Sequence, residues 1–147
     1  MHQIYPYFIK FHIAFSVLFL LTIIGITIQS LVGWLRAKEY SLLEERLRRT
    51  YLILLYFDMI LGVILYFFLQ KPADVMSTEE ALNFSKLRFW AIQHFSNIIF
   101  VVILCTVGNV LIKKTDLPEK KFKYSVFYFG ISTVIIILSV GFFALRK

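Results

Sequence analysis

Four long apolar segments dominate this sequence of 147 residues. Each reaches the roughly 20 residues that a helix needs to cross a hydrocarbon core of roughly 30 Å. Lys10 and Asp58 are the only formally charged residues inside them. The chain is therefore predicted to be all-α: an integral membrane four-helix up-down bundle that forms a single transmembrane domain over residues 1–147. The predicted spans cover about residues 8–34, 51–69, 89–112 and 124–145.

Composition excludes the main soluble alternatives. Hydrophobic residues make up 59% of the chain, with a mean hydropathy of +0.76, whereas a soluble domain is usually about 45–50% apolar. A single cysteine, Cys105, allows no intramolecular disulfide and no cysteine-based metal site. The first apolar segment has no basic leader and no cleavage site of small residues, so we expect it to remain as a span and not to act as a signal peptide.

The distribution of basic residues predicts the orientation. Residues 36–49 and 113–123 together hold ten lysines and arginines, against six on the other side of the predicted membrane. Basic loops usually face the cytoplasm, so we expect a multi-pass protein of the inner (cytoplasmic) membrane with both termini outside. The net charge of +7 suits anionic lipid headgroups, and nothing indicates nucleic acid.

Two histidines form the main candidate site. His12 and His94 lie one to two turns inside the predicted first and third spans, which run in the same direction and so place both imidazoles at a similar depth. Two such imidazoles could be the axial ligands of one b-type haem. Each could instead be an interfacial histidine bonded to a carbonyl or a headgroup. A copper or zinc site would lack the further ligands that those ions normally take.

Other features of the sequence limit the predicted cofactor. Lys10, Lys86 and Arg88 lie near the same outer rim and could pair with haem propionates. A second haem would need ligands about four turns deeper, where Ile26 and Gly108 stand, so we expect one haem. A C-x-x-C-H motif is absent, so that haem would be noncovalent.

Asp58 is the third candidate, because ionisable groups inside a membrane are costly and usually functional. We expect it about two turns from the cytoplasmic end of the second span. It could serve as a proton relay or quinone-site group. Alternatively, it could be a structural carboxylate bonded to Gln29, Thr106 or Asn109.

Two polar stretches flank the spans. Residues 77–80 read S-T-E-E, a capping-box pattern that predicts a short helix across the outer mouth of the bundle. Residues 41–49 are expected to extend a helix into the cytoplasm or to lie on its surface.

Several motifs resemble a family of short four-helix bacterial membrane proteins catalogued as cytochrome b or cytochrome b-like. They are His12, the G-W-L of residues 33–35, the L-G-V-I-L-Y-F of residues 61–67 and the L-R-F-W-A-I-Q-H of residues 87–94. The resemblance covers essentially the whole chain and implies a b-haem carried by His12 and His94. At residues 56–58 this chain reads Y-F-D, where the family often carries His-x-Gln. A possible third histidine is therefore missing.

The leading functional hypothesis is a membrane b-type cytochrome module that passes electrons near the outer face. Its donor could be the quinol pool, its acceptor a redox partner protein, and the chain a subunit of a larger membrane complex. We expect electron transfer and not stand-alone catalysis. The alternative is a haem-free accessory or assembly subunit, in which small residues mark close helix contacts. These residues are Gly25, Gly62, Gly108, Gly130 and Gly141.

Overall fold

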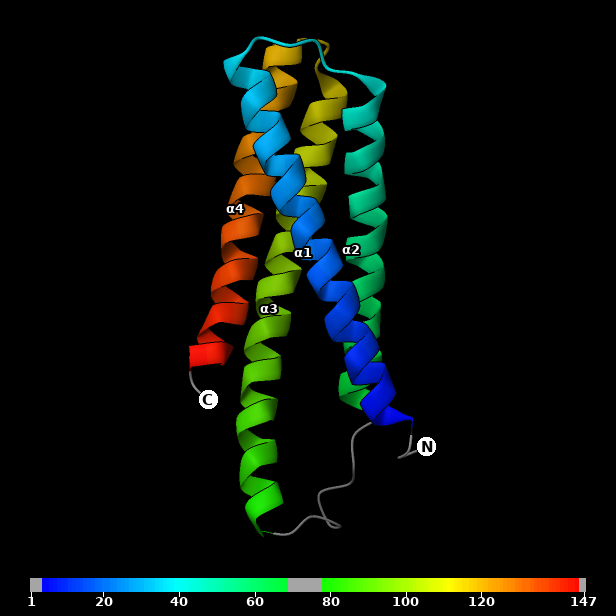
Figure 1. Ribbon diagram of the computed structural model, residues 1–147, viewed down its shortest axis with the longest axis vertical. Coiled ribbons are helices and arrows are strands. Elements are labelled where there is room, and N and C mark those ends of the chain that lie inside the picture. The colour runs from blue at the N-terminus through cyan, green and yellow to red at the C-terminus, as the bar shows by residue number, and fades with distance from the viewer. Residues whose placement is uncertain (1–3, 69–77, 146–147) are drawn as a thin grey trace.

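The computed structural model describes residues 4–68 and 78–145, which form four long helices (Figure 1). Both chain ends point to one end of the bundle, called here the terminal end. The connections α1–α2 and α3–α4 lie at the opposite end, called here the loop end. The helices are α1 (Tyr5–Leu35), α2 (Leu42–Phe68), α3 (Thr78–Lys114) and α4 (Pro118–Leu145).

The helices pack in a ring. Helix α1 packs against α2 and α4, and α3 packs against the same two neighbours. Helices α1 and α3 therefore occupy diagonal corners, and so do α2 and α4. A side chain that points inward from α1 faces one that points inward from α3 across the bundle axis. This arrangement confirms the predicted all-α bundle.

The outer surface of the bundle is apolar, as a lipid environment requires. All four helices are long and apolar enough to cross a membrane, and only 17–33% of the most apolar window in each is buried inside the protein. Large hydrophobic side chains are exposed along every helix. The inner core is small and is centred on Phe19, Ile23, Leu55, Val101 and Phe129.

Two helix starts differ in how well the sequence predicted them. The stretch 41–49 forms the first turns of α2, so its interpretation as a helix extension is confirmed. Ser41 and Glu44 make a capping box there: the Ser41 amide donates to the Glu44 carboxylate at 2.9 Å, and the Leu43 amide donates to Ser41 Oγ at 3.2 Å.

The expected short helix across the outer mouth is wrong. Helix α3 runs without a break from Thr78 to Lys114, so Thr78–Glu80 is simply its first turn; Ser77 lies outside the described residues. No glycine or proline stands between Thr78 and Phe89 to end a helix.

Helix α1 ends in a Schellman motif. The Lys38 amide donates to the Gly33 carbonyl at 3.0 Å, and the Ala37 amide donates to the Trp34 carbonyl at 3.2 Å. Ala37 holds the left-handed position with φ 49°, which glycine normally occupies because a Cβ atom is unfavourable there. The tight turn carries the chain directly from α1 toward α2.

We predict that Ala37→Gly stabilises the protein by about 0.5–1 kcal/mol, because it removes the left-handed strain. Ala37→Val is the control, and it should destabilise the protein, since a β-branched residue fits this backbone poorly. Detergent-solubilised unfolding curves measure both effects. Equal free energies of unfolding for Ala37→Gly and Ala37→Val would show that the backbone at residue 37 carries no strain.

Candidate functional site around two histidines and an aspartate

Asp58 of α2 is held by two side chains of α1. His12 Nδ1 lies 3.1 Å from Asp58 Oδ1, and the two side chains are only 21% and 6% exposed. The contact has ion-pair distance without the alignment of a hydrogen bond. Ser16 Oγ, one turn after His12, donates to the carboxylate at 3.1 and 3.3 Å. Gly62, one turn after Asp58, lies beside the imidazole, and a Cβ there would be in ordinary van der Waals contact with His12 Cε1 at 3.8 Å.

His94 of α3 completes the cluster from the diagonal corner. Its Nδ1 lies 3.0 Å from Ser139 Oγ on α4, and Ser139 is buried. The imidazole is also within electrostatic reach of His12 and Asp58. All four helices thus contribute a polar side chain to one region in the terminal half of the bundle.

Asp58 is not where the sequence suggested. None of its three expected partners contacts it: Gln29 donates to Glu44, Thr106 bonds to Tyr56, and Asn109 accepts from Arg48. The reason is the early start of α2, at Leu42 and not near residue 51. At a rise of 1.5 Å per residue, Asp58 lies about 24 Å from the loop end of its helix, at the level of His12.

The predicted propionate partners lie at the periphery of this region. Lys10 is exposed, half a turn before His12 on α1. Arg88 Nε donates to the hydroxyl of Tyr66 at 3.1 Å, so this exposed side chain is attached to α2. Their pairing with propionates stays a prediction.

The donor set of the site suits a haem better than a bare metal ion. Among the described residues, no three histidine, cysteine, aspartate or glutamate side chains gather as a metal-holding group. A bis-histidine haem needs only two ligands. In each imidazole Nδ1 lies within 3.1 Å of an oxygen, as in the outer-shell contacts that orient ligating histidines. The residues present therefore fit a b-type haem.

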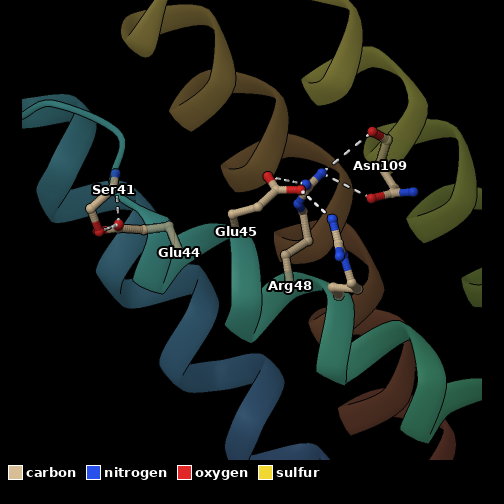
Figure 2. A network of polar contacts seen from close by, with 6 residues as sticks. Ser41, Glu44, Glu45, Arg48 and Asn109 are labelled. Carbon is tan, nitrogen blue, oxygen red and sulfur yellow. Dashed lines mark hydrogen bonds and ion pairs between the residues drawn. The ribbon is translucent and has the colours of Figure 1, made fainter.

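A second polar cluster at the loop end was not predicted from the sequence (Figure 2). Arg48 is only 1% exposed, although its position suggested a loop charge. Its Nη1 donates to the Asn109 side-chain oxygen at 2.9 Å and to the Asn109 carbonyl at 3.4 Å, and its Nη2 pairs with Glu45. Arg49, in contrast, is 64% exposed and lies 3.6 Å from Glu45. The buried guanidinium ties α2 to α3.

A small cavity of about 10 Å³ lies beside Arg48, between α1, α2 and α4. It has room for about one water molecule. Ser30 and Ser125, on α1 and α4, bond to each other at 2.8 Å along its wall. Burial raises the pKa of Tyr40, which also lines the cavity, to about 12. The phenol therefore stays neutral at every physiological pH.

Comparisons with models of protein families, with curated proteins and with solved structures found no match for this chain. The resemblance to cytochrome b-like proteins thus rests on the sequence motifs alone.

We predict that Asn109→Ala destabilises the protein by about 2 kcal/mol, because it deprives a buried guanidinium of a hydrogen-bond partner. The double variant Arg48→Met/Asn109→Leu should recover most of the loss, since it replaces both partners by apolar groups. Unfolding in detergent measures both, and Arg49→Met is the exposed control, expected within about 0.5 kcal/mol of wild type. A double variant less stable than Asn109→Ala would contradict this account.

Proposed function

We propose that the protein is a membrane b-type cytochrome module that carries electrons through one noncovalent haem, with His12 and His94 as axial ligands. One observation carries the proposal: His12 and His94, from diagonal helices, lie within electrostatic reach of each other, and each has Nδ1 within 3.1 Å of an oxygen. When bound, a b-type haem supplies a one-electron redox carrier.

The surrounding side chains have supporting roles in this proposal. The Asp58 carboxylate, 3.1 Å from His12 Nδ1, favours a proton on that nitrogen and therefore the tautomer whose Nε2 could bind iron. Ser16 holds the carboxylate in place, and Ser139 orients His94. Buried Phe19, Leu61 and Ile98 keep water out of the neighbouring core.

Orientation and partners follow from the same proposal. The loop end, with its ten basic residues, faces the cytoplasm of a bacterial cell. The histidine site then lies toward the outer face of the inner membrane, within reach of the quinol pool and of an outer redox partner. The chain acts as an electron-transfer subunit of a larger membrane complex.

The alternative is a haem-free accessory subunit that docks against a larger complex. Gly25 and Gly141 favour it, because a Cβ added at either would meet nothing within 4 Å, which leaves space for a foreign helix. Gly62, Gly108 and Gly130 instead approach His12, Tyr128 and Thr27 inside the bundle. They are therefore occupied by contacts within this chain.

The two proposed functions predict different absorption spectra for the purified protein. We expect a reduced-minus-oxidised spectrum with sharp α and Soret bands at a stoichiometric haem content. His12→Ala and His94→Ala should each convert the low-spin haem signal in electron paramagnetic resonance to high spin or abolish binding. His2→Ala is the matched histidine control and should leave the spectrum unchanged. A protein that stays colourless after expression with ample haem would favour the accessory function.

Asp58→Asn tests the supporting role of the carboxylate. We predict that this variant binds haem about 10–100-fold more weakly, as loss of an outer-shell partner usually does, while the low-spin bis-histidine signal persists. Haem titration of the apoprotein measures the change. Ser96→Ala, which removes an exposed hydroxyl of α3 bonded only to its own helix, is the control. Equal haem affinities of Asp58→Asn and Ser96→Ala would show that Asp58 does not support haem binding.

A further inference from the structure

Positive charge exceeds negative charge across the loop end, most where the α1–α2 connection meets the start of α4. The loop end holds ten basic and five acidic residues. Residues 36–39 and 119–123 hold five of these basic residues and only two acidic ones. The other half, residues 44–49 and 113–116, has five basic and three acidic residues, and its Arg48 is buried. Both halves therefore carry a positive excess, +3 where the α1–α2 connection meets the start of α4 and +2 in the other half.

Two lysines in this region are held on aromatic rings. Lys121 Nζ lies 5.2 Å from the centre of the Tyr40 ring, and Lys123 Nζ lies 5.6 Å from the centre of the Trp34 ring. Such contacts restrain the ammonium groups without using their hydrogen-bond donors. We call Trp34, Tyr40, Lys121, Phe122 and Lys123 the lysine–aromatic patch.

Phe122 fixes the patch to the bundle. It is 1% exposed and packs on Tyr40 with 5.1 Å between ring centres. It also fills the space over Gly33, where an added Cβ would lie 2.5 Å from the Phe122 ring. The first turn of α4 is thus locked to the end of α1, and both lysines are pre-positioned.

We propose that the lysine–aromatic patch binds the phosphate of an anionic phospholipid. Tryptophan and tyrosine are the residues that favour the headgroup level, and the patch lies where the membrane-spanning parts of α1 and α4 end. Below Trp34 and Lys123, exposed Leu31 and Phe127 lie one turn deeper on the same helix faces. These exposed apolar side chains are available to the acyl chains of a lipid, which a free anion lacks.

The proposal does not depend on haem binding, and Trp34 itself reports on it. The experiment uses the full chain with Trp90→Phe, which leaves Trp34 as the sole tryptophan, in phosphatidylcholine vesicles. Trp34 quenching by brominated phosphatidylglycerol is compared with quenching by brominated phosphatidylcholine. We expect the anionic lipid to associate on the order of 30-fold more strongly, because each of the two lysines near the phosphate contributes about fivefold. The preference should fall with added salt.

Two double variants distinguish lipid binding at the lysine–aromatic patch from attraction by the general positive charge of the loop end. Lys121→Gln/Lys123→Gln should abolish the preference, whereas Lys113→Gln/Lys114→Gln, which removes the same charge from exposed positions of the same end, should keep most of it. Equal quenching by the two lipids would overturn the proposal. So would an equal loss in both double variants, or relief of the anionic-lipid quenching by millimolar inorganic phosphate.

Discussion

The position of Asp58 in the bundle interior is the constraint on which the rest of the terminal half depends. A carboxylate inside a membrane is costly unless other side chains surround it. Asp58 meets this requirement through Ser16 and His12 on a single face of α1. These contacts fix how α1 is rotated and how far it is shifted along α2. As a consequence, His12 is held beside α2, within electrostatic reach of His94 on the diagonal helix.

The interior is divided into two polar regions with an apolar layer between them. The histidine–aspartate cluster lies in the terminal half, and the Arg48 cluster lies at the loop end. Between them, Phe19 stacks on Tyr51 at 5.0 Å, and Leu55 is fully buried. Most polar side chains at this level bond within the protein, as Thr27 does to Thr133 and Cys105 to Ser132. The layer separates the ionisable groups of the two ends.

The sequence predicted the features that follow from length and hydropathy, and missed those that depend on helix rotation. The four spans and the shared depth of His12 and His94 needed only the rise per residue. The level of Asp58 was wrong because the second span was counted from residue 51, whereas α2 begins at Leu42 and its Glu44 already lies beside Gln29 of α1. The burial of Arg48 depends on which face of α2 turns toward α3, and a count of basic residues carries no such information.

Helix α4 connects the two ends of the molecule. It packs against both α1 and α3, it contacts His94 through Ser139, and it begins with Lys121 and Lys123 on the aromatic rings. Lys123 and Ser139 are 16 residues apart, about 24 Å along a helix, against a hydrocarbon thickness of roughly 30 Å. If headgroups anchor the lysines, Ser139 comes to lie near the opposite interface. A redox partner of the proposed haem site would then approach from the terminal end, because the loop end is separated from the site by almost the whole membrane.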